Sequence, residues 1–385
     1  MSAPIYLDYN ATTPVDDRVL DAMLPFLREH YGNPHSEHAF GWAADEAVKK
    51  AREQTAKVIG ATPRTVFFTS GATEAISLAI RGAGAIYGGR RHRIVTVRTE
   101  HKAVLATCEA MEREGYETTY LPVDANGLVD PDAVEAALTD ETFLVSVMWG
   151  NNETGVLQPI AEIAERAHAA GAVMMTDATQ AVGKVPISVN HDGVDLLAMS
   201  GHKMYGPKGV GALYVRQRGP RVKLQPQITG GDQEGGLRGG TLNVPGIVGL
   251  GAASHIARRQ LAADAERMTV LRDRFEEAVC AAIPGTIVNG GGAPRLPNTS
   301  SLRFDGVASD RLLPVLYGVA ASTGSACQSQ SDAPSHVLLA MGLSESQARS
   351  TVRFSLGRQT TAAEVDAAVE QVAVGVSLVR RRRAA

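Results

Sequence analysis

The segment Ser200-Gly201-His202-Lys203 places a lysine beside a hydroxyl, an imidazole and a glycine-rich turn. It follows the apolar run 194–199, which is typical of a buried strand, so we expect Lys203 at the mouth of that strand. A lysine withdrawn from water has a lowered pKa, and its neutral amine is able to form a Schiff base. Taken alone, the segment favours the alternative, a surface lysine in a glycine turn, so it has to be weighed with the residues upstream.

A second segment, residues 67–74, reads as a strand that enters a helix through Ser70-Gly71-Ala72-Thr73. The free amides at the start of that helix and the Thr73 hydroxyl form a site for an anion, and Ser200 and His202 add further donors. A plain helix cap at Ser70 or Thr73 is the alternative. A lysine imine together with a phosphate site points to pyridoxal phosphate, which stabilises a carbanion at the α-carbon of an amino acid.

Three further residues fit that cofactor. Asp177 follows an apolar strand run and is suited to hold a proton on a pyridine nitrogen, and Gln180 is suited to donate to a ring hydroxyl. His101, in Thr99-Glu100-His101-Lys102, is suited to stack on the ring and carry protons. Helix caps are the alternative for both Asp177 and His101.

Two more residues carry chemistry outside this group. Cys327 lies among small and polar residues at 322–335, where an exposed thiol suits a nucleophile better than a core residue. Arg353 alternates with apolar residues on a short strand, where a guanidinium is able to clamp a carboxylate; a surface ion pair is the alternative. The other cysteines, Cys108 and Cys280, lie on helix patterns and are expected in the core.

Composition limits the classes of function. The 385 residues are 44% hydrophobic and 21% charged, with a formal net charge of −3, which is typical of a globular enzyme-sized chain and gives no overall attraction to nucleic acid or membrane. No apolar stretch approaches the roughly 20 residues that span a bilayer, and no secretion signal is recognisable. Three cysteines without metal-ligand spacing suit a reducing cytoplasm, and we assign no metal ligands.

Short β-branched runs alternate with helical patterns between about residues 64 and 215, which predicts a mostly parallel seven-stranded sheet flanked by helices. The predicted strands are residues 66–69, 94–97, 118–122, 143–148, 172–176, 194–199 and 211–215. The predicted helices include 74–85, 159–170 and a long one at 248–283 with Leu261, Met268, Leu271, Phe275 and Val279 as its apolar stripe. In such sheets ligands bind at the carboxyl ends of the strands, where the candidate residues fall.

The long helix is expected to lead into a smaller α+β domain. We place a large cofactor-binding domain at residues 16–259 and a small domain at 1–15 and 260–385 that carries the Cys327 loop. The glycine-rich stretch 230–240 contains no P-loop and reads as a flexible surface loop or as a close approach to a ligand or neighbouring subunit. Arg380–Arg383 read as a frayed, solvated tail rather than a nucleic-acid site.

Together these motifs resemble the cysteine desulfurases of the NifS/IscS type, which are class V aminotransferases of fold type I. The resemblance covers nearly the whole chain. It is carried by YLDYNATTP (6–14), GNP (32–34), SGATE (70–74), TEHKAV (99–104), NNETG (151–155), DATQ (177–180), SGHKMYGPKG (200–209), GGT (239–241), STGSAC (322–327) and VRFSLGR (352–358).

The resemblance implies a role for each matching residue. Lys203 would bind the cofactor as an imine and then move the α-proton, with His101 stacked on the ring, and Cys327 would attack the sulfur of L-cysteine. The remaining cofactor contacts would come from Ala72, Thr73, Asn152, Asp177, Gln180, Ser200, His202 and, towards the partner subunit's phosphate, Thr241. Asn152 and Arg353 would orient the substrate carboxylate.

The activity implied is conversion of L-cysteine to L-alanine, with the sulfur held as a persulfide on Cys327 in a homodimer. The sulfur would pass to an acceptor protein that docks near the Cys327 loop, serving iron–sulfur cluster assembly, tRNA thiolation or DNA phosphorothioation. A selenocysteine lyase or another class V enzyme is an alternative within the fold. A sulfur-relay or assembly platform without catalysis is the alternative outside it.

Overall fold

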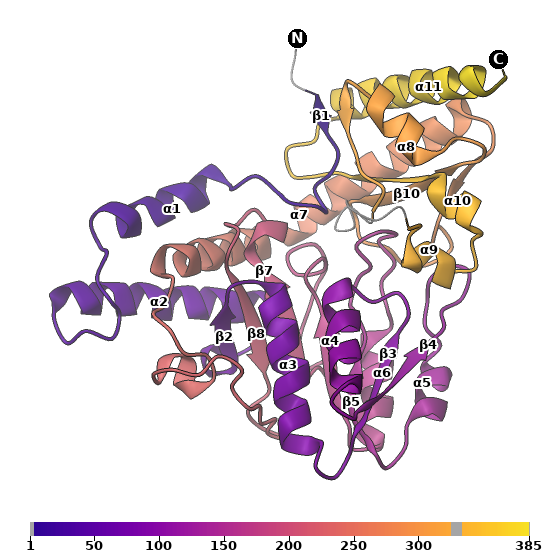
Figure 1. Cartoon of the computed structure of the whole chain (residues 1–385). Coiled ribbons are helices and arrows are strands. Elements are labelled where there is room, and N and C mark those ends of the chain that lie inside the picture. Colours follow the sequence, from indigo (N-terminus) through magenta and orange to yellow (C-terminus); the bar gives the residue numbers. More distant parts are fainter. Residues whose placement is uncertain (1–3, 325–332, 385) are drawn as a thin grey trace.

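The computed structural model describes residues 4–324 and 333–384. A large α/β unit surrounds one seven-stranded sheet, and a smaller unit lies at the end of the molecule where both termini are found (Figure 1). None of the helices within these two ranges has an apolar stretch long enough to cross a membrane.

The large sheet has the strand order β2-β8-β7-β6-β5-β3-β4. Its strands are β2 (Val66–Thr69), β3 (Arg93–Val97), β4 (Glu117–Leu121), β5 (Thr142–Ser146), β6 (Val173–Asp177), β7 (Leu196–Ser200) and β8 (Gly211–Val215). Strand β8 is antiparallel to both neighbours, and the other adjacent pairs are parallel. The predicted seven-stranded, mostly parallel sheet is therefore confirmed.

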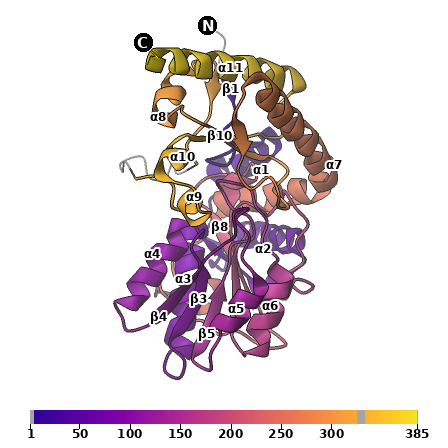
Figure 2. The same cartoon turned by 90° about the vertical axis from the view of Figure 1, so that its right-hand side faces the viewer.

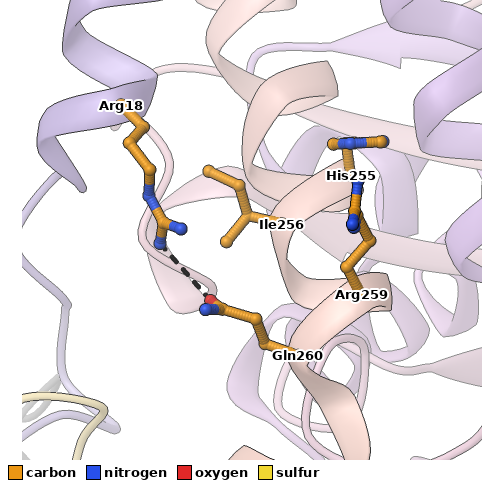
Figure 3. A pocket seen from close by; sticks show the side chains of 5 residues that line it. All are labelled: Arg18, His255, Ile256, Arg259 and Gln260. Atoms are coloured by element: carbon orange, nitrogen blue, oxygen red, sulfur yellow. Dashed lines mark hydrogen bonds between the residues drawn. The ribbon is translucent and has the colours of Figure 1, made fainter.

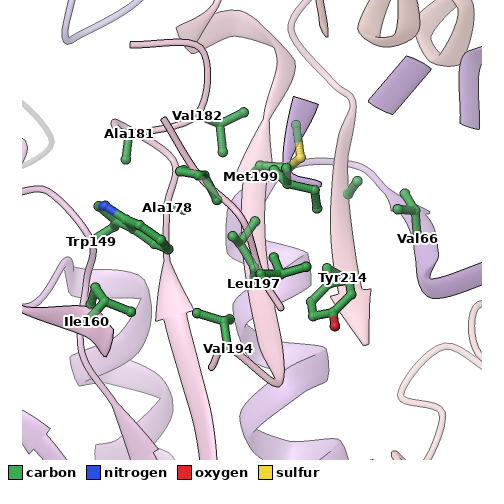
Figure 4. Packing of buried hydrophobic residues seen from close by; sticks show 14 of the residues in the cluster. Val66, Trp149, Ile160, Ala178, Ala181, Val182, Val194, Leu197, Met199 and Tyr214 are labelled. Carbon is green, nitrogen blue, oxygen red and sulfur yellow. The ribbon is translucent and has the colours of Figure 1, made fainter. Parts of the chain in front are cut away.

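Each face of the sheet is covered by helices because the strands are apolar on both sides. In β7, Leu196 and Ala198 pack in a cluster with α3 (Ala72–Tyr87) and α4 (Lys102–Glu112). Leu197 and Met199 pack on the opposite face, close to Trp149 (Figure 4). The helices of that second face are α2 (Ala39–Val58), α6 (Ile160–Ala169) and the first half of α7 (Val244–Ala282).

Two shorter helices complete the large unit. Helix α1 (Asp17–Arg28) lies against α7 at the side of the molecule (Figure 1). Helix α5 (Pro131–Ala137) packs against α6 (Figure 2). Cys108 in α4 is fully buried, as expected of a core residue.

Helix α7 joins the two units as one continuous helix. Leu250 in its first half belongs to the large core, whereas Phe275 and Val279 in its second half belong to a separate small core. Leu261, predicted on the apolar stripe, is only half-buried, because it lies where the helix passes from one core to the other. We propose that the domains divide near this point, at 16–259 and at 1–15 with 260–385.

The small unit combines a three-stranded antiparallel sheet with helices, as the α+β prediction requires. The sheet has the order β12-β10-β9, and β1 at the N-terminus pairs in parallel with β11. The strands are β1 (Ile5–Tyr6), β9 (Thr286–Val288), β10 (Thr299–Phe304), β11 (Val319–Ala320) and β12 (Thr351–Ser355). The helices are α8 (Ser309–Leu312), α9 (His336–Ala340), α10 (Glu345–Arg349) and α11 (Ala362–Ala384).

The arginine-rich C-terminus differs from its prediction. Arg380–Arg383 continue α11, and Arg380 donates to the carbonyl of Pro284 at 3.1 Å. The segment is helical rather than frayed, since Val376 and Val379 pack this part of the helix on the small core, whereas the exposed side chains of Arg381 and Arg382 agree with the predicted solvation.

The glycine-rich stretch is fastened to the large unit by two ion pairs. The Glu234 side chain is fully buried and accepts hydrogen bonds from Arg52 at 2.6 and 2.7 Å and from the Phe68 amide at 2.7 Å. Arg238 pairs with Glu74 of α3 at 2.9 Å. The interpretation as a flexible surface loop is wrong, because these partners lie far away in the sequence.

We predict that Glu234→Gln lowers the free energy of unfolding by roughly 3 kcal/mol, because it leaves the Arg52 guanidinium in a mostly buried place without its carboxylate. Urea unfolding followed by circular dichroism measures the change. The matched control is Glu46→Gln, whose ion pair with Lys49 is exposed to solvent, so its removal should change the free energy of unfolding far less. Equal losses in the two variants would contradict the structural role of Glu234.

Candidate active site at the carboxyl edge of the large sheet

A cavity of about 600 Å³ lies at the carboxyl edge of the large sheet, between the two units. Its walls come from the segments that follow β2, β3, β5, β6 and β7, from the N-terminal segment and from β12. The predicted site residues that line it are Ala72, Thr73, His101, Asn152, Asp177, Gln180, Ser200, His202, Lys203 and Arg353. Residues spread over most of the chain therefore meet at the carboxyl ends of the strands, where ligands bind in sheets of this kind.

Lys203 ends a short 3₁₀ turn (Gly201–Lys203) directly after β7 and is half-buried. Its amine donates to the backbone carbonyls of Asn10 at 2.6 Å and Ala11 at 2.8 Å. Thr13 fastens the same N-terminal segment to the turn, since its amide and hydroxyl both donate to the His202 carbonyl at 3.0 Å. Lys203 is therefore a positioned amine at the wall of the cavity, not a surface lysine.

The start of α3 forms one end of the cavity. Gly71 is its N-cap and no side chain caps the helix, so the amides of the first turn are left for another acceptor. The plain-cap alternative for Ser70 and Thr73 is thus not what the structure contains. Ser200, His202 and Lys208 line the cavity with this turn, and together these groups suit a phosphate.

His202 is neutral at pH 7 in this setting. Burial, followed by the positive charges of Lys203, Lys208 and Lys184, lowers its pKa to about 4. Its Nδ1 lies 3.1 Å from the Thr12 hydroxyl. A neutral imidazole still donates one hydrogen bond, so His202 remains suited to contact an anion.

Asp177 ends β6 with its side chain almost fully buried, and one carboxylate oxygen accepts from the Thr179 amide at 2.9 Å. The buried Glu100 lies close enough to interact with it. Burial, and then the charge of Asp177, raises the pKa of Glu100 well above its usual range. Of these two carboxyl groups, only that of Asp177 lines the cavity.

His101 both caps a helix and lines the cavity. Its Nδ1 accepts a hydrogen bond from the Ala103 amide at 3.1 Å, which makes it the N-cap of α4. Because Nδ1 is the acceptor, the neutral ring carries its hydrogen on Nε2. The two interpretations of His101 are therefore compatible, and the cap fixes the tautomer of the ring.

Arg353 on β12 forms an ion pair with Asp8, and this pair is buried rather than on the surface. Its Nη2 donates to Asp8 at 2.7 Å and to Ser322 at 2.8 Å, and its Nη1 donates to the Asn152 carbonyl at 2.9 Å. Its Nε is buried and has no hydrogen-bond partner in the part of the chain that the structure describes. Because Arg353 also lines the cavity, its guanidinium lies beside the space that a ligand carboxylate would occupy.

The buried Glu153 contacts both flanks of the segment that contains Cys327. Its Oε2 accepts from the Ser335 hydroxyl at 2.5 Å. On the other flank, a Cβ added at Gly324 would lie 3.1 Å from the same oxygen. Burial raises the pKa of Glu153, and the hydrogen bond from Ser335 opposes that effect. The NNETG segment therefore supports both flanks, a role that sequence reasoning missed.

The cavity does not test the predictions for two residues. Cys327 lies outside the residues that the structure describes, so its placement stays a prediction. Thr241 is exposed and does not line the cavity. Its expected role concerns the site of a partner subunit and also stays a prediction.

Other lining residues were missed. Asn10, Ala11 and Thr12 belong to a segment whose motif was noted but given no role, and Lys208 lies in the SGHKMYGPKG motif. The polar run Asn10-Ala11-Thr12-Thr13-Pro14 after a short apolar stretch was the available signal.

A second hollow, of about 470 Å³, lies between α1 and α7 (Figure 3). It is lined by Arg18, His255, Ile256, Arg259 and Gln260. Arg18 spans it to Gln260 at 3.3 Å while pairing with Asp16 at 2.7 Å. It contains none of the predicted site residues, so the cavity beside Lys203 is the candidate active site.

Comparison with known proteins agrees with this geometry. The chain belongs to the aminotransferase class-V family, whose family model matches residues 5–368. It is 50% identical over 384 residues to the cysteine desulfurase IscS of Anaeromyxobacter sp. (strain Fw109-5), covering 100% of this chain and 94% of that protein.

Solved structures agree as well. A NifS-like protein superposes with a TM-score of 0.90 at 38% identity, covering 97% of this chain and 100% of the other. A structure described as SspA in complex with cysteine has a TM-score of 0.82 at 39% identity and covers 91% of this chain and 98% of the other. The predicted family and fold type are confirmed.

We predict that His202 makes stability depend on pH. The unfolded chain takes up the proton of this histidine near pH 6.5, the folded chain only near pH 4, so folding loses stability as the pH falls through that window. His202→Gln should remove this part of the loss, seen in urea unfolding without added ligand at several pH values. His191→Gln, at a side chain 83% exposed, is the control. If the free energy of unfolding of His202→Gln fell with pH as steeply as that of wild type, the burial argument would be contradicted.

We predict that Gly324→Ala destabilises the protein by about 2–4 kcal/mol, since the new methyl group meets both a left-handed backbone (φ +75°) and the Glu153 carboxyl. Gly342→Ala is the matched control: its φ is +87°, but no atom lies within 4 Å of the added Cβ. Its free energy of unfolding should fall by only about 1 kcal/mol, the cost of the left-handed backbone for alanine. Urea unfolding of the two variants decides, and equal losses would exclude the contact with Glu153.

Proposed function

We propose that this chain is a pyridoxal-phosphate-dependent cysteine desulfurase that converts L-cysteine to L-alanine and keeps the sulfur on Cys327. One observation carries the proposal: an amine, an uncapped helix start and a buried carboxylate converge in the same cavity. The family membership and the desulfurase relatives support it, and the neighbour crystallised with cysteine supports L-cysteine as substrate.

The residues present fit pyridoxal phosphate. The first turn of α3, with Thr73, Ser200 and His202, would hold the phosphate, and Asp177 would pair with the pyridine nitrogen. Gln180 would donate to the ring oxygen, and Ala72, Asn152 and His101 would contact the ring. When bound, the cofactor supplies an electron sink for the substrate α-carbon.

The chain supplies orientation and proton transfer. Arg353 and Asn152 would hold the substrate carboxylate, which fixes the α-carbon near Lys203. Lys203 Nζ would hold the cofactor and, as a free amine, would take the α-proton of the substrate. The two carbonyls at Asn10 and Ala11 accept from this amine and so keep it on the cavity wall.

Sulfur transfer follows from the chemistry of a thiolate. Cys327 would attack the sulfur of the substrate, so that an S–S bond forms as the carbon–sulfur bond breaks. The electron pair of the broken bond stays with the β-carbon of the substrate. That carbon takes up a proton, and the product is released as alanine. The sulfur remains on Cys327 as a persulfide, and no external oxidant is needed.

A homodimer is part of the proposal. Tyr31, Phe40 and Trp42, around the connection between α1 and α2, are 72%, 53% and 61% exposed, and the rings of Tyr31 and Phe40 lie 5.7 Å apart. Exposed aromatic groups of this kind are typical of an interface. In such a dimer Thr241 would reach the phosphate of the partner subunit.

We further propose that the persulfide sulfur passes in the cytoplasm to an acceptor protein that docks near residues 322–335. Iron–sulfur cluster assembly, tRNA thiolation and DNA phosphorothioation are the routes considered. A persulfide suits such a relay because its outer sulfur is transferred by thiol exchange.

We predict that Cys327→Ser abolishes sulfide release while leaving cofactor binding intact. The protein is incubated with L-cysteine and dithiothreitol, and sulfide, alanine and the visible absorption of the lysine imine are followed. Wild type should give equimolar alanine and sulfide, and Cys327→Ser a spectral response with at least about a hundredfold less sulfide.

Lys203→Ala is the control for the cofactor and should lose the imine absorption altogether. Sulfide release that survives in Cys327→Ser would favour a selenocysteine lyase or another class V enzyme. No imine absorption in wild type with added pyridoxal phosphate would favour a non-catalytic platform.

A further inference from the structure

Lys184 is a buried cation that the proposed chemistry does not use. It lies four residues after Gln180, is 6% exposed and does not line the cavity. Its Nζ donates to Gln180 Oε1 at 2.7 Å and to Asn10 Oδ1 at 3.4 Å. The charges that act on it, those of Lys203 and Arg353, are both repulsive, and with burial they lower its pKa to about 7.

This environment does not explain Lys184 as a stabilising residue. Burying an amine beside two other cations costs free energy, and no carboxylate that would offset this cost is among the charges that act on Lys184. A methionine would fill a similar volume without that cost. The contacts of the amine therefore point to a role at the neighbouring site.

The amine fixes the orientation of the Gln180 amide. The lysine nitrogen is the donor in this contact, and the amide atom that accepts from it is Gln180 Oε1. With Oε1 turned to Lys184, the amide nitrogen faces the other way and donates to the Asn10 carbonyl at 2.9 Å, on the side where Gln180 lines the cavity. Without Lys184, the amide would keep only the hydrogen bond of its nitrogen to the Asn10 carbonyl, and its oxygen end would lose the donor that now holds it.

Asn10 is oriented by the same amine. Its Oδ1 accepts from Lys184 and from Asn298 at 3.1 Å, so its Nδ2 donates to Thr299 at 2.8 Å. The backbone carbonyl of this asparagine accepts from Lys203 at 2.6 Å. Lys184 thus supports, through one residue, the group that holds the reactive amine.

We propose that Lys184 is a positioning residue, which turns the NH₂ group of Gln180 towards the cavity so that it donates to the ring oxygen of bound pyridoxal phosphate. It acts through Gln180 and touches neither cofactor nor substrate. The inference rests on the proposed function, because the group that receives the hydrogen bond belongs to the cofactor.

A double-mutant cycle tests this role. Lys184→Met is made in wild type and in Gln180→Ala, and the Kd for pyridoxal phosphate of each full-length protein is measured by titration of the visible absorption. In the Gln180 background we expect Lys184→Met to weaken binding about tenfold, and in the Gln180→Ala background less than about twofold. Equal loss in both backgrounds, or no loss in the first, would overturn the proposal.

Gln180→Glu is the second variant. A glutamate keeps the contact with Lys184 as an ion pair but has no hydrogen to donate when ionised. We expect the variant to remain folded, because the ion pair with Lys184 offsets the lost hydrogen bond to the Asn10 carbonyl. We expect cofactor binding to be weakened about as much as by Lys184→Met. Unchanged cofactor binding in this folded variant would overturn the proposal even if Lys184→Met failed to fold.

The outcome for Lys184 is separable from that of the proposed function. If wild type itself fails to bind pyridoxal phosphate through an imine, the proposed function fails and the positioning role fails with it. If wild type binds the cofactor and the cycle is additive, only the role of Lys184 is lost.

Discussion

The site depends on a set of oxygen atoms that accept hydrogen bonds from two lysine amines. Lys203 and Lys184 both donate to Asn10, one to its backbone carbonyl and one to its side chain. Neutral oxygens hold an amine in place without stabilising its charge as strongly as a carboxylate would. That balance suits an amine that must form and exchange a covalent bond, and the fold has to bring the N-terminal segment to the carboxyl edge of the sheet to achieve it.

The sheet was readily predicted from sequence. Strands β2 and β8 have the predicted limits, and β7 differs by two residues at its start, because continuous apolar runs bounded by glycine or polar residues specify buried strands. The carboxyl-edge rule then placed His101, Asp177 and Lys203 at one cavity. Local pattern and sheet geometry were sufficient for this part of the site.

The missed contacts are those between distant segments. Asn10 and Lys184 are 174 residues apart, and the AVGK segment around Lys184 has no local feature that predicts burial of its amine. The glycine-rich stretch was misjudged for the same reason, since Glu234 finds Arg52 from 182 residues away. Composition describes what a segment prefers by itself, whereas these side chains are buried only because another part of the chain supplies a partner.

The contacts of the N-terminal segment also determine at what stage of synthesis the cavity can be completed. Asp8 and Asn10 are synthesised long before their partners, because they bond to Arg353 and Ser355, each across 345 residues. The large sheet is complete in sequence by residue 215, so it is able to form while the C-terminal part is still being made. The cavity cannot acquire its final wall until β12 has left the exit tunnel, so a nascent or truncated chain holds a folded sheet but no finished site.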